Sequence, residues 1–377
     1  MHSFPRLVQL NRDDEAYLER ARVIAHQGWG KVHPNPMVGC VLVKNGHIIG
    51  EGYHEIFGGP HAELLALERA RSEPAGATAY VSLEPCNHFG KTPPCTQALV
   101  RAGIRRVVFG ATDPGIVSAG GAGALRDAGV QVIGPVWGDR EARAENPFFT
   151  HAVRHQRPFV ALKLAMSLDA KIASASGVRT RITGTEAERE VHRLRTGFDS
   201  IMVGAGTVRA DNPRLTTRLV PPGREPVKRV LLMPRADVDI TSAVLEDTGR
   251  FPVHIFCLDK EANVSMQFES SGVHIEQVAA DSGDNSLLDL EAVLGRCHEL
   301  GFRSVLCEGG ARLAAGLLKL SLVDRLYLFI SPVALGGAGL PGFSEDANHT
   351  DWDNYSPACR PAAFGTDTLI TLDRIVD

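Results

Sequence analysis

Short apolar runs alternate with amphipathic segments along nearly all of the chain, and this alternation is the strongest constraint on its fold. Apolar runs bounded by turn residues predict strands, whereas apolar residues three and four positions apart predict helices. Strands that alternate with helices favour an α/β fold with helices on both faces of each sheet. The pair Asn45-Gly46 lies between two apolar runs and predicts a β-hairpin early in the chain.

Both halves of the 377-residue chain show this pattern. In the first half we expect strands at 38–43, 47–50, 78–83, 106–110 and 130–133, with helices at 11–28, 61–71, 94–102, 121–127 and 139–146. In the second half we expect strands at 159–164, 200–204, 229–233, 253–257, 303–307, 325–330 and 368–372, helices at 186–196, 287–299 and 311–320, and loops at 234–250 and 278–286. Because domains usually have about 100–200 residues, we predict two of them, 1–150 and 157–377.

Composition argues against several classes of protein. No apolar stretch approaches the roughly 20 residues that cross a membrane, and the N-terminus lacks a secretory apolar segment. With 40 basic and 44 acidic residues, the chain has no excess of positive charge that would attract nucleic acid or an anionic membrane. Seven scattered cysteines do not match a disulfide framework. We therefore expect a cytoplasmic protein whose partners include neither nucleic acid nor a membrane.

Three short motifs place metal-binding side chains near junctions of strands and helices. His61 lies at an expected helix start, Cys86 follows the strand 78–83, and Cys95 lies at the next helix start. One histidine and two cysteines can bind zinc and leave its fourth position for water, as catalytic zinc sites do. The positive end of a helix dipole also lowers the pKa of a thiol and favours metal binding. The three motifs together predict a zinc site, with His88 as an alternative ligand.

Glu63 follows His61 by two residues and can move protons between water, a ring nitrogen and departing ammonia. The order His-x-Glu, then Pro-Cys, then a second Cys is typical of zinc deaminases, in which the glutamate does not bind the metal. Here eight residues separate Cys86 from Cys95 instead of two. This insertion excludes the simplest cytidine-deaminase pattern and puts a basic residue, Lys91, beside the metal. The opposing hypothesis is a structural zinc in a nucleic-acid-binding module, which requires a fourth protein ligand and a basic face.

These motifs resemble the bifunctional deaminase/reductase family of riboflavin biosynthesis. The resemblance rests on the segments 33–39, 52–54 and 83–95, whose long spacing between the cysteines is typical of that family. It implies that Asn35 and His54 bind a pyrimidine, Lys91 a 5′-phosphate and Asp113 the ribose region. Gly115 departs from the family pattern, which has an asparagine there, and so removes one amide that would contact substrate.

The second half lacks the G-x-G-x-x-G fingerprint of dinucleotide-binding folds. Two glycine-containing junctions, at 203–208 and 308–311, each follow an expected strand and can direct backbone N–H groups at a phosphate. The segments 162–169, 191–195, 203–212, 215–218 and 308–310 resemble, in order, the reductase half of the same family. That half is similar in fold to dihydrofolate reductase, which binds NADPH without the fingerprint.

The resemblance implies two sets of residues in this half. NADPH would contact Ala165, Arg181, Thr207, Asp211 and the turn beginning at Gly310. The substrate would contact Lys163, Arg179, Arg195, Leu215, Arg218 and Glu308. The arginines suit a phosphate because their planar guanidinium groups pair with its oxygens.

The implied function is hydrolytic, zinc-dependent deamination of a 2,5-diamino-6-ribosylaminopyrimidinone 5′-phosphate, followed by NADPH-dependent reduction of ribosyl to ribityl. The expected partner is this small phosphorylated pyrimidine, and we expect a homo-oligomer. Several positions of the reductase half depart from the family pattern, namely Ala170, Arg179, Arg181 and Met233. They motivate an alternative, in which the chain is a deaminase only and its second domain binds substrate or supports assembly.

Overall fold

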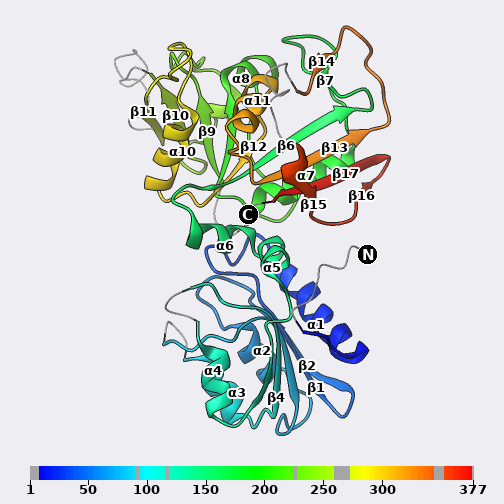
Figure 1. Ribbon diagram of the computed structural model, residues 1–377. Helices are drawn as coiled ribbons and strands as arrows, with labels where there is room; N and C mark the ends of the chain where they lie inside the picture. Colours follow the sequence, from blue (N-terminus) through cyan, green and yellow to red (C-terminus); the bar gives the residue numbers. More distant parts are fainter. Residues whose placement is uncertain are drawn as a thin grey trace. The chain divides into compact units, whose positions relative to one another are not determined.

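The chain forms two compact units, Met1–His155 and Gln156–Asp377. The computed structural model (Figure 1) describes residues 8–89, 93–115, 119–223, 227–258, 272–343 and 352–375. The division at residue 155 falls between the two expected domains. Within these described ranges, no helix is long and apolar enough to cross a membrane.

The first unit contains a five-stranded sheet of mixed direction. Its strands, in spatial order, are β2 (His47–Tyr53), β1 (Gly39–Lys44), β3 (Thr78–Leu83), β4 (Arg106–Ala111) and β5 (Gln131–Ile133). The expected hairpin is present: β1 pairs antiparallel with β2, and Asn45 and Gly46 in the turn both have positive φ. β3, β4 and β5 are parallel, so their carboxyl ends meet at one edge of the sheet.

Helices cover both faces of this sheet, as the alternating pattern predicts (Figure 1). α1 (Arg12–Ala25) packs Leu18, Ala21 and Ile24 against one face. The other face is covered by α2 (Ala62–Glu68), α3 (Cys95–Arg101) and α4 (Gly121–Asp127). The unit also contains the 3-10 turn η1 (His26–Gly28), α5 (Asp139–Glu145) and α6 (Pro147–Arg154). Because α2 and α3 begin at the carboxyl edge of the sheet, their first residues lie close together.

The second unit contains a ten-stranded sheet. Nine strands follow the spatial order β11 (Val273–Gln277), β10 (Val253–Cys257), β9 (Lys228–Leu232), β8 (Ser200–Gly204), β12 (Ser304–Cys307), β6 (Phe159–Ser167), β13 (Arg325–Ser331), β17 (Asp367–Arg374) and β15 (Tyr355–Pro357), and β16 (Ala362–Phe364) pairs with β17. The run from β11 to β13 is parallel, and β17 adds an antiparallel edge. A separate pair joins β7 (Lys171–Ala173) to β14 (Leu340–Pro341).

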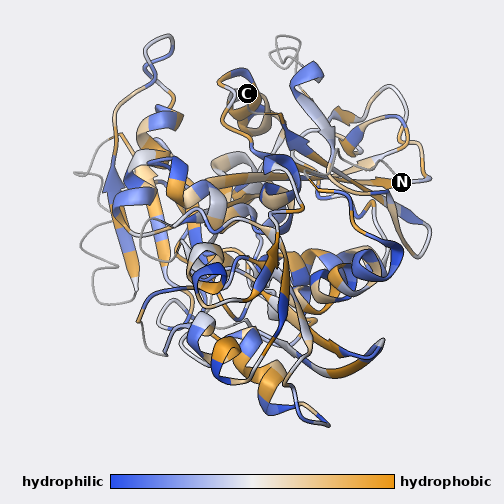
Figure 2. Ribbon diagram, turned by 60° about the horizontal axis from the view of Figure 1, so that its bottom comes forward, coloured by the Kyte–Doolittle hydropathy of each residue, from blue (hydrophilic) through white to orange (hydrophobic). Residues whose placement is uncertain are grey.

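Two apolar clusters lie on opposite faces of this large sheet. α10 (Leu290–Glu299) and α11 (Ala311–Lys319) contribute to one cluster. α8 (Ala205–Asp211) contributes Val208 to the other. In Figure 2 several strands are coloured as hydrophobic, whereas many helices change between hydrophilic and hydrophobic colours along their length. The amphipathic α7 (Thr185–Thr196) buries Val191, His192 and Leu194. The described part of the unit also contains the short 3-10 turns η2 (Ala243–Leu245) and η4 (Trp352–Asn354).

The expected strands and helices are present at nearly the expected positions, with several additions. The sequence did not predict α6, α8, β7, β11, β14, β15 and β16, and η2 lies within the expected loop 234–250. The unexpected helix α8 begins at Ala205, within the segment 203–208 that the sequence indicated only as a glycine-containing junction.

Candidate active sites

The three candidate zinc ligands of the first unit lie together at the carboxyl edge of its sheet. His61 is the N-cap of α2, Cys86 follows β3, and Cys95 is the first residue of α3. The His61 Nδ1 atom lies 3.2 Å from Cys95 Sγ and 3.4 Å from Cys86 Sγ. All three ligand atoms lie within 4.8 Å of one another, and in the described part of the chain they form the one such group of histidine, cysteine and acidic residues.

This geometry fits a tetrahedral zinc ion. Ligands at zinc bond lengths of about 2.0–2.3 Å lie roughly 3.5 Å apart, close to the two His61–cysteine distances. Hydrogen bonds from Cys95 and His61 lower the pKa of the Cys86 thiol to about 4, although burial opposes them. A cysteine that is already a thiolate is the form that binds a metal. Three converging protein ligands leave one tetrahedral position for water.

Glu63 lies in the first turn of α2, one residue beyond Ala62, and its side chain is 3% exposed. Burial raises the pKa of its carboxyl group above the usual range, and Cys95 lies close enough to interact with it. Because α2 begins at His61, the helix places the metal ligand and this carboxyl on neighbouring positions of one turn. The carboxyl is therefore close to the ligand set, although it is not part of it.

Asn35 and His54 lie beside the same group of ligands. The Nδ1 atom of His54 is 3.0 Å from the carbonyl oxygen of Pro60, and its Nε2 atom is 3.1 Å from Asn35 Nδ2. Because a carbonyl oxygen only accepts, Nδ1 carries the proton and Nε2 accepts from the asparagine amide. The rings of His54 and His61 are 5.5 Å apart, edge to face. Asn35, His54 and the candidate zinc site thus form one continuous cluster.

Glu84 connects the end of β3 to the start of α4. One carboxylate oxygen accepts the N–H of Ala122 at 2.9 Å, and the other accepts the N–H of Asp113 at 3.3 Å. Asp113, 6% exposed, in turn accepts the N–H of Gly115 at 2.8 Å. Although Glu84 lies in the motif that identifies the site, its sequence position alone did not indicate a role. Its hydrogen bonds connect the segment just before Cys86 to the backbone of Asp113 and to the start of α4.

Gly121 is needed at the same junction. A Cβ atom at this position would lie 1.7 Å from the carbonyl oxygen of Pro85, well inside contact distance. The start of α4 is therefore pressed against the residue before Cys86. Lys91, the residue implied to bind the phosphate, lies outside the described residues.

In the second unit, Lys163, Arg195 and Glu308 form a buried ion cluster. β6 and β12 are neighbours, with Leu162 paired to Cys307, so the next residues, Lys163 and Glu308, lie side by side. Glu308 binds the Arg195 guanidinium at 2.6 and 2.9 Å, and it lies 3.8 Å from Lys163 Nζ. Burial by itself would raise the pKa of Glu308, but Arg195 and Lys163 outweigh it and lower the pKa to about 2. The carboxylate stays ionised, and the cluster keeps an excess of positive charge.

Arg195 also binds the segment 214–218, which contains Leu215 and Arg218. Its Nη1 atom donates to the carbonyl oxygen of Thr216 at 2.8 Å. Leu215 is 3% exposed and has φ of +50°, a conformation that is strained for a leucine. Arg218 donates from Nη1 to Thr216 Oγ1 at 3.1 Å. Four of the six substrate residues implied by the resemblance therefore form one connected network: Lys163, Arg195, Arg218 and Glu308.

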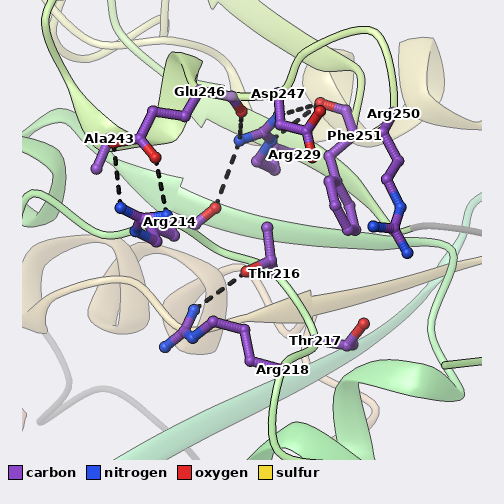
Figure 3. A pocket seen from close by; sticks show the side chains of 10 residues that line it. All are labelled: Arg214, Thr216, Thr217, Arg218, Arg229, Ala243, Glu246, Asp247, Arg250 and Phe251. Atoms are coloured by element: carbon purple, nitrogen blue, oxygen red, sulfur yellow. Dashed lines mark hydrogen bonds and ion pairs between the residues drawn. The ribbon is translucent and has the colours of Figure 1, made fainter. Parts of the chain in front are cut away.

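Behind this segment lies a cavity of about 210 Å³ that is lined by four arginines (Figure 3). Arg229 is fully buried and donates to the carbonyl oxygens of Glu246 at 2.9 Å, Arg214 at 3.5 Å and Phe251. Arg214 forms an ion pair with Glu246 at 2.8 Å. Arg218 and Arg250 complete the set. Arg229 thus contacts the backbone at residue 214, where the segment 214–218 begins.

Thr207 and Gly310, two of the residues implied to bind NADPH, lie at the carboxyl edge of the second sheet. β8 and β12 are parallel neighbours, and α8 and α11 begin directly after them. The N–H of Gly310 donates to Thr207 Oγ1 at 2.9 Å, which joins the two helix starts. A Cβ atom at Gly309 would lie 2.8 Å from Leu313 Cδ2 and 3.2 Å from the backbone of Gly204. Two helix N-termini at one sheet edge suit the phosphates of a dinucleotide, so these residues fit the cofactor.

The other residues that the resemblance implies for NADPH, and the substrate residue Arg179, do not lie at the two helix starts. Ala165 lies on β6 and Asp211 ends α8, where burial raises the pKa of its carboxyl group. Arg181 is two-thirds exposed and binds Glu188 of α7 at 3.1 Å, so it is already paired within its own chain. Arg179 is exposed, and its charge acts on Asp211.

Two of the unusual positions have clear structural settings. Met233 is fully buried in an apolar cluster. Ala170 has φ of +57° in a turn, where the family pattern has glycine. A glycine at that position would avoid the steric cost of the left-handed region.

Fold and site together define a zinc-dependent deaminase unit joined to a reductase unit. Residues 11–111 match the cytidine and deoxycytidylate deaminase zinc-binding region, and residues 158–357 match the RibD C-terminal domain. The chain is 39% identical to the riboflavin biosynthesis protein RibD of Actinobacillus pleuropneumoniae over 325 residues, which are 86% of this chain and 85% of that protein. With the Escherichia coli protein of the same name it shares 38% identity over 346 residues, 89% and 93% of the two chains.

Two solved structures resemble the whole chain. Acinetobacter baumannii RibD has a TM-score of 0.80 and 31% identity, and it covers 96% of this chain and 99% of its own. The diaminohydroxyphosphoribosylaminopyrimidine deaminase/5-amino-6-(5-phosphoribosylamino)uracil reductase of Thermotoga maritima has a TM-score of 0.80, 35% identity and the same coverage. The chain belongs to the RibD family of bifunctional deaminase/reductases of riboflavin biosynthesis. The expected zinc and NADPH chemistry is that of its two domains.

Proposed function

We propose that the first unit hydrolyses the 2-amino group of a 2,5-diamino-6-ribosylaminopyrimidinone 5′-phosphate and that the second reduces the ribosyl group of the product to ribityl. The observation that carries the proposal is the cluster of His61, Cys86 and Cys95, with Glu63 in the first turn of the helix that His61 caps. Hydrolysis replaces the amino group by oxygen and releases ammonia. Reduction adds a hydride from NADPH and a proton to the opened sugar.

In the deaminase unit, zinc held by His61, Cys86 and Cys95 would supply hydroxide at neutral pH by acidifying water. Glu63 takes one proton from the attacking water and passes it to the ring nitrogen, and it then takes the remaining hydroxyl proton and passes it to the leaving amine, which departs as ammonia. Asn35 and His54 orient the pyrimidine through the hydrogen-bonded pair that they form. Lys91 binds the 5′-phosphate, and Asp113 contacts the ribose region.

In the reductase unit, the protein positions two reactants so that hydride transfer can occur. Lys163, Arg195 and Arg218, with Leu215 and Glu308, bind the ribosylamino phosphate, and Arg179 adds a further cation. Ala165, Thr207, Asp211 and Gly310, with Arg181, bind NADPH. The excess of positive charge in the buried cluster favours a phosphate, because Glu308 compensates only one of the two cations that it contacts.

The test is incubation of the diamino substrate with the zinc-loaded protein, with and without NADPH, followed by mass analysis. We expect the deaminated product in both reactions and the ribityl product only with NADPH. Glu63→Gln should retain zinc and lose deamination, whereas Glu68→Gln, on the exposed face of the same helix, should deaminate like the wild type. A Glu63→Gln variant with wild-type deamination would contradict the proposed proton transfer. Deamination without reduction would support the alternative of a deaminase with an impaired reductase unit.

We also propose that the protein is a cytoplasmic homo-oligomer that takes a small phosphorylated pyrimidine. Cell fractionation tests the location, and light scattering during gel filtration tests the oligomeric state. A monomer in solution would contradict the assembly.

A further inference from the structure

The segment 214–218 carries two proposed substrate contacts, yet it is held in place largely through its backbone. Arg229 binds the carbonyl oxygen of residue 214 at 3.5 Å, and Arg195 binds the carbonyl oxygen of residue 216 at 2.8 Å. The third contact is made by His192, whose Nδ1 atom accepts the N–H of Arg218 at 3.1 Å. The three side chains, of which Arg229 and His192 are buried, therefore hold alternate residues of the segment, 214, 216 and 218.

His192 lies within the segment 191–195 that resembles the reductase family, but the resemblance assigned it no role. It lies on α7, three residues before Arg195, so both side chains project from the same face of the helix. It is 2% exposed. Because the backbone N–H donates to Nδ1, that nitrogen must be unprotonated and the ring carries its proton on Nε2. Burial, followed by the charges of Arg195 and Arg218, lowers the pKa of His192 to about 4, so the ring is neutral near pH 7.

The strain in the segment explains why such a contact matters. Leu215 has φ of +50°, and a residue in this region persists only where its surroundings hold it. Without the contact at Arg218, the segment has one fewer backbone anchor after the strained residue. The Arg218 side chain would then sample more directions, although its own charge is unchanged.

We propose that His192 is a positioning residue of the reductase: by accepting the N–H of Arg218, it directs the Arg218 guanidinium at the substrate phosphate. The inference rests on the proposed role of Arg218 in binding that phosphate. Replacement of a histidine that was merely buried would lower the stability of the unit and would change the binding of substrate and of NADPH alike. Replacement of a positioning residue should weaken the binding of substrate alone. The contact acts on binding of the phosphorylated substrate and leaves the NADPH contacts on β6 and α8 unchanged.

Two substitutions separate the hydrogen bond from the volume of the ring. His192→Asn keeps an acceptor at the position of Nδ1, whereas His192→Leu fills a similar volume without one. Loss of a hydrogen bond of ordinary strength should raise the KM for the ribosylamino phosphate on the order of tenfold in His192→Leu. We expect a change of less than about threefold in His192→Asn, and no change in the KM for NADPH in either variant. His298→Leu on the exposed face of α10 is the matched control.

Deaminase activity of the same full-length chains gives the concentration of chains with an intact first unit, and the reductase rates are normalised to it. Hydrogen exchange of the Arg218 amide reports the contact directly: exchange should be faster in His192→Leu and remain slow in His192→Asn. In an Arg218→Ala background, His192→Leu should not raise the KM for the ribosylamino phosphate any further, because His192 acts on that substrate through Arg218. An equal effect of His192→Leu with and without Arg218 would overturn the proposal, even if the leucine variant is less stable. Faster exchange with an unchanged KM would also overturn it.

The proposed function can fail independently. If the wild type does not oxidise NADPH with substrate, the reductase function fails, and ribose 5-phosphate then serves as the probe. Its affinity should fall in His192→Leu and recover in His192→Asn, whereas equal affinity in all three proteins would refute the positioning role.

Discussion

Replacing Glu308 by glutamine tests the buried ion cluster most directly. The carboxylate is bound by two Arg195 nitrogens and lies 3.8 Å from Lys163. Its side chain is 8% exposed. Glutamine keeps the shape but removes the charge, so two cations remain in a buried site without their counterion. Removal of one partner from a buried ion pair costs about 3–5 kcal/mol.

The lowered pKa of Glu308 gives an independent magnitude. A fall from 4.5 to about 2 corresponds to about 3 kcal/mol at 1.36 kcal/mol per pH unit. Because the pKa is lower in the folded protein, this stabilisation is fully present above about pH 4.5 and is lost as the pH falls toward 2. The two estimates agree, so Glu308→Gln should lower the free energy of unfolding of the second unit by about 3 kcal/mol at pH 7.

Peptide-resolved hydrogen exchange on the intact chain is the appropriate assay, because two units need not unfold together. Amides of β6 and β12 that exchange through global opening should exchange on the order of 100-fold faster in Glu308→Gln. Amides of β1 in the first unit should not change, which gives an internal reference. Glu188→Gln removes a carboxylate whose ion pair with Arg181 is exposed, and it should cost less than about 1 kcal/mol. Exchange of β6 within threefold of the wild type would refute the argument that Glu308 compensates the buried cations.

Three further predictions address other parts of the molecule. Gly121→Ala should abolish deamination and weaken zinc binding, measured by metal analysis, because its Cβ would overlap Pro85 beside Cys86; Gly123→Ala on the same helix meets nothing within 4 Å and should be tolerated. Removal of zinc by a chelator should stop deamination but leave NADPH oxidation intact when the deaminated substrate is supplied, and simultaneous loss of both activities would contradict independent sites. Ala170→Gly should raise the stability of the second unit by up to about 1 kcal/mol in thermal unfolding, because Ala170 has positive φ; Ala175→Gly, where φ is not positive, should not stabilise it.

The sequence predicted the folds of both units because their strands are short apolar runs with clear boundaries. The set of zinc ligands could also be predicted from the sequence, because His61, Cys86 and Cys95 all lie near junctions of strands and helices. In an α/β sheet, such junctions meet at one edge, so residues distant in sequence become neighbours. The positions of the three ligands in the sequence were therefore sufficient to predict that their side chains lie close together.

Other features depend on contacts that no local pattern contains. α6 extends past residue 150, where the first expected domain ends, and it buries Phe148, Thr150 and His151. The seven-residue helix α8 begins after Gly204 and contains Gly206, and glycines locally favour a turn. The bond between His192 and Arg218 joins residues 26 positions apart, and its geometry depends on how α7 packs beside the segment 214–218. Sequence spacing gives no such information.

Glu63 and Glu308, one in each candidate site, show how the same side chain can serve two different purposes. Glu63 lies beside metal ligands, and burial raises the pKa of its carboxyl group. Glu308 contacts Arg195 and Lys163, which together lower its pKa to about 2. Environments that shift pKa values in opposite directions separate a group that exchanges protons from one that remains charged. Glu63 is therefore suited to move protons during deamination, whereas Glu308 is suited to hold two cations in fixed positions around a phosphate without taking part in proton transfer.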